Sequence, residues 1–300
     1  MALRAPMRQR PFIILNPSAG VPRRRFVAAV LARLSALGAV ATVVEPDTRE
    51  QAAAMARDAC ATHDMIVAGG GDGTIRQVSA AISGSGVPLG IIPLGTGNVL
   101  AREIELGNDP VRVADVLIEG NIKVVQGALA NNEPFYLMAG IGFDARVVDG
   151  LNQTLKRFSG RAAYAPALLR AWRRPVDQLS VTIDGAEFKA NWLLVSNARH
   201  YGGSFVVAPN ASIFSTGLKV ILIRAETRRE LAWQLLQLAT GRLTATGNLA
   251  VREFDASHVT VSNLSPEYSS VPVQIDGDSS GTLPLTIDAN GPQLRLIVPH

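Results

Sequence analysis

The chain has 300 residues, of which 47% are apolar, 18% are charged and one is a cysteine. This length and apolar content are enough for a substantial hydrophobic core and suit two domains better than one. The formal net charge is only +4, with a pI of about 9.6, and aromatic residues make up 5%, which argues against a nucleic-acid-binding protein that stacks bases. No apolar run approaches the roughly 18 residues of a membrane span. Cys60 alone excludes an internal disulfide, and the basic start precedes too short an apolar run for a signal peptide, so we expect a cytoplasmic protein.

The first part of the chain alternates short apolar runs with segments of helical periodicity. Strands are predicted at 12–15, 40–44, 65–68 and 89–92, and helices at 24–37, 50–62, 110–119 and directly after each of two glycine-rich loops. This alternation is typical of a doubly wound, largely parallel sheet, in which ligands bind at the carboxyl ends of the strands. We therefore expect a binding site at that edge of the sheet.

The first glycine-rich loop is Gly69-Gly70-Gly71-Asp72-Gly73-Thr74, with a helix predicted to start near Thr74. Glycine amides and a helix N-terminus together favour the binding of a phosphate. Asp72 would repel that phosphate unless it holds a metal ion, which indicates magnesium-phosphate chemistry. A tight turn with an N-capping Asp is the alternative. The loop has neither the Gly-Lys-Ser/Thr of a Walker loop nor the spacing of a dinucleotide fingerprint.

A second loop, Pro93-Leu94-Gly95-Thr96-Gly97-Asn98, again stands between an apolar run and a helical segment. Together with Asn16-Pro17-Ser18-Ala19-Gly20, the two loops resemble the catalytic domain shared by bacterial diacylglycerol kinases, related lipid kinases and sphingosine kinases. The first loop alone also resembles NAD kinase, but the second is similar to the lipid-kinase branch. The resemblance, together with the glycine-rich loops, implies nucleotide binding by Asn16, Thr48, Gly70, Gly71, Gly73, Thr74, Gly95, Thr96, Gly97, Asn98 and Arg157. Thr48 also suits a plain N-cap.

From Ile122 the sequence changes to many short predicted strands separated by Gly, Pro, Asn and Asp, which is typical of an antiparallel β-sandwich. The predicted strands are 123–130, 133–139, 178–183, 187–196, 205–208, 218–224, 258–262, 271–275, 283–287 and 293–298. Two helices interrupt them: 152–173, which Pro166 should kink, and one from the capping box Thr227–Glu230 to about Thr240. The resemblance implies an α/β nucleotide domain (1–127) and a β-sandwich lipid-substrate domain (128–300), whose last strand can return to the first domain.

The segment Asp276-Gly277-Asp278 matches the Asp-Gly-Glu motif of the family, with Asp278 in place of Glu. The resemblance implies general-base and metal-water roles for these carboxylates, so Asp72, Asp276 and Asp278 are the candidate catalytic residues and Asp72 and Asp278 the candidate metal ligands. A hairpin turn is the alternative reading of Asp-Gly. Two segments resemble, more weakly, the part of the family that approaches the phosphates and the acceptor headgroup: Gly140–Asp144 and Lys156-Arg157. A buried strand end explains the first equally well, and a solvated helix face explains the second.

Besides Asp278, two further positions depart from the family pattern. Val99 replaces the Asp that usually follows Gly-Thr-Gly-Asn, and Thr216 replaces the Asp of an Asp-Gly-Leu sequence. The second departure removes the carboxylate of a structural magnesium site found in some members, so we expect no structural magnesium there. These departures weaken the case for diacylglycerol as the acceptor more than the case for a lipid kinase.

The sequence therefore predicts an ATP- and Mg²⁺-dependent kinase that phosphorylates the hydroxyl of a lipid alcohol, diacylglycerol-like or sphingoid. NAD kinase is one alternative, and a nucleotide- or lipid-binding regulator without catalysis is another. A lipid acceptor implies visits to an anionic membrane surface, for which the arginine clusters 23–25 and 170–174 are candidates, although solvated helix faces explain them equally well. The oligomeric state is left open, a homodimer included.

Overall fold

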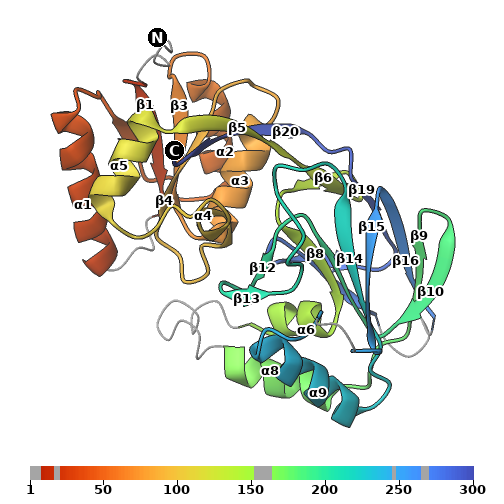
Figure 1. The fold of residues 1–300 in the computed structure, drawn as a ribbon. Coiled ribbons are helices and arrows are strands. Elements are labelled where there is room, and N and C mark those ends of the chain that lie inside the picture. Colours follow the sequence, from red (N-terminus) through yellow and green to blue (C-terminus); the bar gives the residue numbers. More distant parts are fainter. Residues whose placement is uncertain (1–7, 17–20, 152–163, 245–247, 265–269) are drawn as a thin grey trace. The chain divides into compact units, whose positions relative to one another are not determined.

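The computed structural model describes residues 8–16, 21–151, 164–244, 248–264 and 270–300 (Figure 1). The chain divides into two compact units. The first consists of Met1–Val125 together with Pro292–His300, and the second consists of Gln126–Gly291. The two units are described separately below.

The first unit is built on a six-stranded sheet of order β2-β1-β3-β4-β20-β5. Its strands are β1 (Pro11–Leu15), β2 (Thr42–Val44), β3 (Met65–Gly70), β4 (Leu89–Pro93), β5 (Asn121–Gln126) and β20 (Gln293–Val298). The pairs β1–β2, β1–β3, β3–β4 and β4–β20 are parallel. Strands β1, β3 and β4 are buried along their whole length, which explains why they are continuously apolar rather than alternating. The predicted parallel α/β sheet is confirmed.

Five helices accompany this sheet: α1 (Val21–Ala36), α2 (Arg49–Ala59), α3 (Asp72–Ile82), α4 (Val99–Glu103) and α5 (Pro110–Glu119). Helix α1 packs against α5, and α2 packs against α3 (Figure 1). Helix α3 begins at Asp72, earlier than predicted, because the strand continues through Gly70 and leaves Gly71 as the N-cap. Strand β2 lies on one side of β1, and β3, the next strand in the chain, lies on the other side. The strand order therefore reverses between β1 and β3. Ligands of such sheets bind at this reversal.

The second unit contains two six-stranded antiparallel sheets, of order β10-β9-β16-β19-β6-β7 and β15-β14-β11-β8-β17-β18. The first comprises β6 (Ala128–Ala130), β7 (Glu133–Phe135), β9 (Leu179–Ile183), β10 (Ala186–Ala190), β16 (His258–Asn263) and β19 (Leu285–Asp288). The second comprises β8 (Met138–Gly142), β11 (Trp192–Ser196), β14 (Leu218–Ile223), β15 (Val251–Ala256), β17 (Pro272–Ile275) and β18 (Asp278–Thr282). A short pair, β12 (His200–Tyr201) and β13 (Phe205–Val206), is separate. The predicted antiparallel β-sandwich is confirmed.

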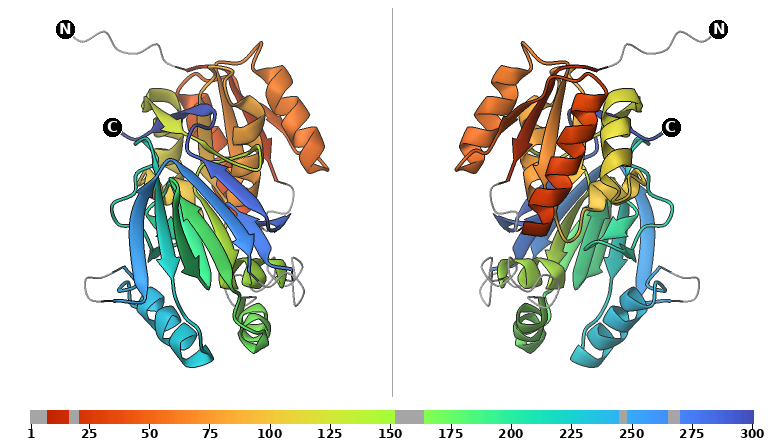
Figure 2. Two further views of the ribbon diagram at one scale, coloured as in Figure 1. Left: turned by 90° about the vertical axis from the view of Figure 1, so that its right-hand side faces the viewer. Right: turned by 90° about the vertical axis from the view of Figure 1, so that its left-hand side faces the viewer.

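Among the described residues of this unit, three helices, α6 (Phe143–Asp149), α8 (Tyr164–Arg173) and α9 (Arg228–Ala239), lie at one end (Figure 2). Strand β11 shows how the two buried faces of its sheet are filled. Leu193 and Val195 enter the core between the sheets, whereas Trp192 and Leu194 enter a second core with residues of all three helices. Because both faces are covered, the strand is apolar at every position except its last.

Several predicted elements have different bounds. The strand expected over 187–196 is two strands, because Asn191 interrupts it and accepts a hydrogen bond from the Ala225 amide through its Oδ1 (2.9 Å). Strands β15 and β18 were not predicted from the sequence. The helix that begins at the capping box of Thr227 and Glu230 is confirmed. Most of the helix expected from Asn152 lies outside the described residues, and Pro166 stands in the first turn of α8.

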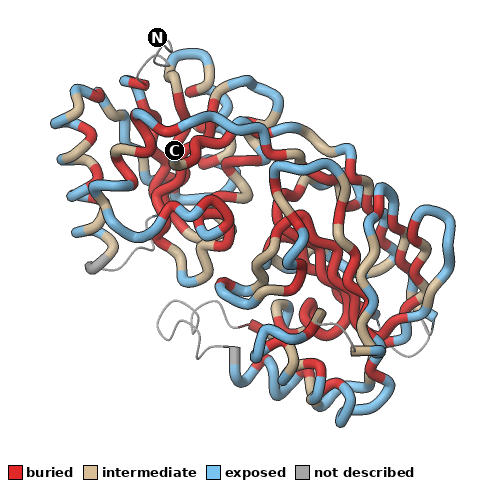
Figure 3. Tube along the Cα trace, viewed as in Figure 1, coloured by how far each residue is buried: buried red, intermediate tan, exposed pale blue. Residues whose placement is uncertain are grey.

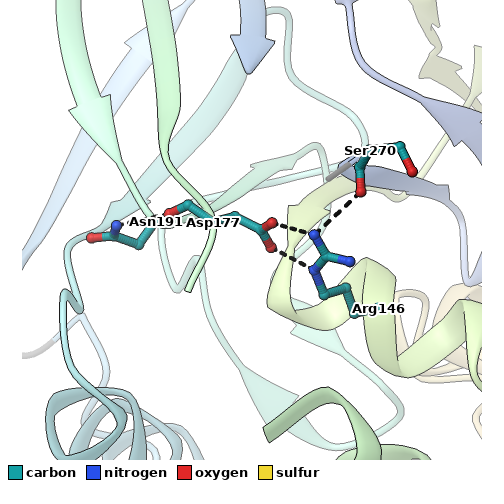
Figure 4. A network of polar contacts seen from close by, with 4 residues as sticks. All are labelled: Arg146, Asp177, Asn191 and Ser270. Carbon is teal, nitrogen blue, oxygen red and sulfur yellow. Dashed lines mark hydrogen bonds and ion pairs between the residues drawn. The ribbon is translucent and has the colours of Figure 1, made fainter. Parts of the chain in front are cut away.

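A buried ion pair fastens α6 to the segment before β9 (Figure 4). Arg146 donates to both carboxylate oxygens of Asp177, through Nε at 2.7 Å and through Nη2, and Nη2 also donates to the Ser270 carbonyl at 3.2 Å. The side chains of Arg146 and Asp177 are only 13% and 5% exposed. The Asp177 carbonyl in turn accepts from the Asn191 side chain at 2.8 Å. Because Asn191 directly precedes β11, these hydrogen bonds connect α6 to β11, the strand that contributes side chains to both cores.

We expect Asp177→Asn to lower the free energy of unfolding by about 3 kcal/mol, because it removes the counter-charge of a buried guanidinium. Urea denaturation of the whole chain measures this. The matched control is Asp255→Asn, whose carboxylate is 85% exposed and lies 2.6 Å from Lys219 Nζ. An exposed pair of that kind contributes less than about 1 kcal/mol. Equal effects of the two substitutions would contradict a special role for the Arg146–Asp177 pair.

Candidate active site

The first glycine-rich loop joins β3 to α3 at the strand-order reversal of the first unit. Its conformation leaves no room for a side chain at Gly70. A Cβ placed on Gly70 would lie 2.5 Å from Thr74 Oγ1, and the amides of Thr74 and Ile75 both donate to the Gly71 carbonyl at 3.0 and 3.1 Å. Thr74 Oγ1 also accepts from the Asn16 side chain at 3.2 Å. Asn16 follows β1, so this hydrogen bond connects the two sides of the reversal.

The second glycine-rich loop joins β4 to α4, and hydrogen bonds of Asn98 stabilise its conformation. Asn98 is in the left-handed region (φ 48°, ψ 47°), which Asn adopts more easily than most residues. Its Oδ1 accepts from the Gly95 amide at 2.8 Å, and its Nδ2 donates to the Gly95 carbonyl at 2.9 Å. Arg102 Nε donates to the Gly97 carbonyl at 3.0 Å. The loop is therefore held by its own side chains.

Asp72 connects the two loops. Its Oδ1 accepts from the amide of Val99, the first residue of α4, at 2.6 Å. The loops approach so closely that a Cβ on Gly95 would lie 2.5 Å from Gly71 Cα, and a Cβ on Gly97 would lie 2.6 Å from Asp72 Oδ2. Glycine at position 97 thus leaves space beside this carboxylate oxygen. Val99, which replaces an Asp of the family pattern, contributes to this contact through its backbone amide.

The structure brings most of the predicted nucleotide-binding residues of the first unit to the carboxyl edge of its parallel sheet. Asn16 follows β1, Thr48 follows β2, the first loop follows β3 and the second follows β4. Thr48 is the N-cap of α2 and accepts from the Gln51 amide at 3.2 Å. Arg157 and Lys156 lie outside the described residues. This edge therefore presents loop amides, the N-terminus of α3 and the carboxylate of Asp72.

In the second unit, Asp276 and Gly277 form the two-residue turn between β17 and β18. Both have positive φ, 49° and 85°, as hairpin turns of this length require. The Asp276 side chain is buried and accepts three backbone hydrogen bonds, from the amides of Tyr136, Leu137 and Met138 at 3.1, 3.0 and 2.9 Å. Asp278, directly after the turn, is half-buried and pairs with Ile275. The turn thus has a structural role, whatever chemistry its carboxylates perform.

Asp144, a buried acid in the segment Gly140–Asp144 that matches the family more weakly, supports this turn. The carboxylate of Asp144, in the first turn of α6, accepts from Trp192 Nε1 and from Gln274 Nε2, each at 3.1 Å. Gln274 Oε1 then accepts from the Gly277 amide at 2.8 Å. A side chain on Gly140 would collide with Asp144 and Gln274. One sequence feature could have revealed the network: Gln274 is a polar residue in an otherwise apolar strand.

Burial raises the pKa of the Asp144 carboxyl to about 7, although hydrogen bonds from Gln274, the Ala145 amide and Trp192 partly offset this. Because the pKa is higher in the folded chain than in the unfolded chain, Asp144 favours folding at low pH and this contribution is lost as pH rises toward 7.

We therefore expect the unfolding free energy of the wild type, relative to Asp144→Asn, to fall by about 1.4 kcal/mol per pH unit between pH 5 and 7. Urea denaturation of both proteins at several pH values measures the difference in slope. Parallel pH profiles would show that Asp144 does not titrate in this range. The comparison uses slopes, so a constant destabilisation caused by the substitution does not affect it.

Other carboxylates do not add a metal site in the described parts of the chain. Within residues 8–16, 21–151, 164–244, 248–264 and 270–300, no group of three or more His, Cys, Asp or Glu side chains is arranged to hold a metal ion. Thr216, the residue in place of a usual Asp, is exposed in the turn before β14. No described helix is long and apolar enough to cross a membrane.

Family models match both units of the chain. Residues 10–129 match the diacylglycerol kinase catalytic domain, and residues 138–298 match the "YegS C-terminal NAD kinase beta sandwich-like domain". The chain belongs to the diacylglycerol kinase catalytic-domain family. The second match covers the sandwich from β8 onward, including the segments that carry Asp144, Gln274 and Asp276.

Relatives of this family match the chain over most of its length. The diacylglycerol kinase of Mycobacterium tuberculosis (strain H37Rv) is 28% identical over 282 residues, which is 90% of this chain and 88% of that protein. The diacylglycerol kinase of Staphylococcus carnosus is 26% identical over 93% of this chain and 91% of that protein. An uncharacterized protein of Synechocystis, sll0036, is 28% identical over 78% of this chain, which spans 54% of that longer protein.

Solved structures share the fold of this family member. A crystal structure of a diacylglycerol kinase from Bacillus anthracis str. Sterne has a TM-score of 0.71 and 17% identity, with 98% of each chain covered. A second crystal structure from the same organism has a TM-score of 0.78 and 19% identity, covering 99% of this chain and 98% of the other. At this identity the likeness shows the fold.

Proposed function

We propose that this chain is an ATP- and Mg²⁺-dependent lipid kinase, which transfers the γ-phosphate of ATP to the hydroxyl of a lipid alcohol. The observation that supports this most directly is the position of Asp72. It stands at the N-terminus of α3, between two glycine-rich loops, with one carboxylate oxygen accepting from the Val99 amide. A carboxylate among phosphate-binding amides suits a metal-bound phosphate and no simple anion. Family membership supports the reaction class.

The loops of the first unit would position the nucleotide. Amides of Gly71 and Gly73 and the N-terminus of α3 would face the phosphates, where glycine allows close approach. The self-bonded Gly95–Asn98 loop, Asn16, Thr48 and Thr74 would complete the contacts. Because these loops follow strands of one rigid sheet, the phosphates would be held with little reorganisation, and this positioning is most of what phosphoryl transfer asks of a protein.

Magnesium fits the chemistry of Asp72. Mg²⁺ prefers oxygen ligands, few protein carboxylates and several waters. Asp72 offers Oδ2 on the side where Gly97 lacks a side chain. When bound, the ion would neutralise charge on the phosphates. Asp278 is the second candidate for a carboxylate that binds the magnesium ion.

We propose Asp278 as the carboxylate that accepts the proton of the lipid hydroxyl, with Asp276 positioning it. Three backbone amides already occupy the Asp276 carboxylate, which leaves it less capacity to accept a substrate proton. The Asp144–Gln274–Gly277 hydrogen bonds hold the same turn from the other side. A base must lie within hydrogen-bond distance of the proton that it removes, so a rigid turn is an advantage.

A turnover assay with labelled ATP tests the proposal against its alternatives. The acceptors should include a diacylglycerol, a sphingoid base and NAD. We expect label in a lipid product, with Mg²⁺ required. Label in NAD would support an NAD kinase, and nucleotide binding without any labelled product would support a regulator that has lost catalysis.

A further inference from the structure

The helices α8 and α9 of the second unit expose large apolar side chains where soluble helices usually bury them. In α8 the buried residues are the small Ala167 and Ala171, whereas Leu168 and Leu169 are 41% and 52% exposed. An amphipathic helix normally does the reverse. Two leucines of α8 are therefore exposed while two of its alanines are buried, and Trp172 is of intermediate exposure; Figure 3 shows exposed, pale blue stretches along this helix.

Helix α9 continues this surface. Arg229, Trp233 and Leu236 follow one another at helical spacing on its exposed side, and Trp233 and Leu236 are 54% and 52% exposed. The opposite side of α9 buries Leu231, Gln234 and Leu238. Helix α9 therefore carries exposed apolar residues on one side, in addition to the residues that it buries on the other.

The two helices belong to one surface of the second unit. Arg228 of α9 donates through Nη2 to the carbonyl of Arg173, the last residue of α8, at 2.9 Å. Both views in Figure 2 show the two helices at the same end of this unit. We call Leu168, Leu169, Trp233 and Leu236 the apolar patch.

The charge around the apolar patch is strongly positive. The stretches 164–174 and 227–250 contain six arginines, all exposed, and a single acidic residue, Glu230, which is used in the capping box. Their net charge of +5 exceeds the +4 of the entire chain, so the remainder is slightly negative. The six are Arg170, Arg173, Arg174, Arg228, Arg229 and Arg242.

We propose that the apolar patch and its six arginines form the surface by which this protein docks on an anionic lipid bilayer. Exposed Leu and Trp beside arginines match the interface of such a bilayer, where apolar side chains enter the acyl boundary and basic ones meet phosphate headgroups. A second copy of the chain is disfavoured as the occupant, because a two-fold contact would place this positive surface against itself. The inference rests on the proposed function, since a lipid acceptor resides in the bilayer.

Vesicle sedimentation of the whole chain tests the docking surface. The test variant is Trp233→Gln/Leu236→Gln, and a second is Arg229→Gln/Arg242→Gln. Each changes exposed side chains only, so folding should be preserved. Phosphatidylcholine vesicles with phosphatidylglycerol should bind the wild type, and those without should not. We expect each lost arginine to weaken binding about fivefold, and the apolar variant to weaken it at least tenfold. Binding should fall as salt shortens the Debye length from roughly 10 Å at 0.1 M to 3 Å at 1 M.

The matched control is Val111→Gln/Val124→Gln, which removes two exposed apolar side chains, 46% and 47% exposed, from the first unit. It should bind vesicles as the wild type does. Unchanged affinity of both test variants, or an equal loss in the control, overturns the proposal. So does a wild-type dimer that the apolar variant converts to monomer while vesicle affinity is kept, because the patch is then an interface between copies.

Kinase assays separate this proposal from the proposed function. With a short-chain lipid alcohol dissolved as monomers, the test variants should turn over as the wild type does, whereas with the same headgroup in anionic vesicles they should be slower by the factor lost in binding. If the wild type phosphorylates no lipid alcohol in either form, the proposed function fails, and sedimentation still decides the docking surface.

Discussion

Asp72→Asn should lower kcat by about 10³-fold, the scale on which one preorganised electrostatic group acts in a transition state. Asparagine retains an oxygen for the Val99 amide, which Asp72 Oδ1 accepts at 2.6 Å, so the two glycine-rich loops should stay together. It loses the negative charge that a magnesium ion would need. Turnover of labelled ATP and urea denaturation, measured on the same preparation, separate these two consequences.

A suitable control for this experiment is Asp109→Asn in the same unit. Asp109 is the N-cap of α5 and accepts from the Arg112 amide at 3.0 Å, a role that Asn fills equally well. Its turnover should equal that of the wild type. An Asp72→Asn protein with near wild-type kcat would exclude the metal role of Asp72, and an unfolded one would show that the charge itself holds the loops together.

The second large effect is expected at the Asp276–Gly277 turn, where two adjacent carboxylates should respond differently. Asp276→Asn must place its amide nitrogen against at least one of the three backbone N–H groups that now donate to it. We expect a loss of about 2 kcal/mol in unfolding free energy together with a loss of turnover. Asp278→Asn should leave the unfolding free energy unchanged and lower kcat by about 10²-fold or more, because it removes the proposed proton acceptor.

The pair of variants forms its own control, since the two substitutions are chemically identical and two residues apart. Full stability and no activity in Asp276→Asn would reverse our assignment and make Asp276 the base. Normal kcat in Asp278→Asn would exclude Asp278 from proton transfer. A pH–rate profile of each variant distinguishes a lost base from a displaced turn, because only a lost base removes a limb of the profile.

The sequence was informative where local chemistry decides the structure. The glycine-rich loops, the Thr227 capping box and the Asp-Gly turn each depend on a few adjacent residues, and all three form at the predicted positions. What the sequence did not reveal depends on long-range packing. The contacts of Asp276 with residues 136–138, and of Asp144 with Trp192 and Gln274, join segments that are far apart in the chain. The polar Gln274 in an apolar strand indicates that a partner exists, but no local pattern identifies that partner.

The exposed side of α8 is a second feature that the sequence did not predict. Periodicity predicted an amphipathic helix around residues 152–173, and it left open whether Leu169 packs on the sandwich or faces outward. In the structure Ala167 and Ala171 of α8 are buried, whereas Leu168 and Leu169 are exposed. Hydrophobicity alone does not predict which side of this helix packs against the unit.

Strand β20 lies between β4 and β5, in the interior of the first sheet, although it is made from the last residues of the chain. Leu294, Leu296, Ile297 and Val298 are buried there. During synthesis, the second unit is complete at Gly291, before the final strand of the first unit exists. The first sheet therefore stays incomplete until residues 293–298 have left the ribosome, and the sandwich has the opportunity to fold first. A fragment ending near residue 129 would keep that gap permanently, exposing two unpaired strand edges to aggregation.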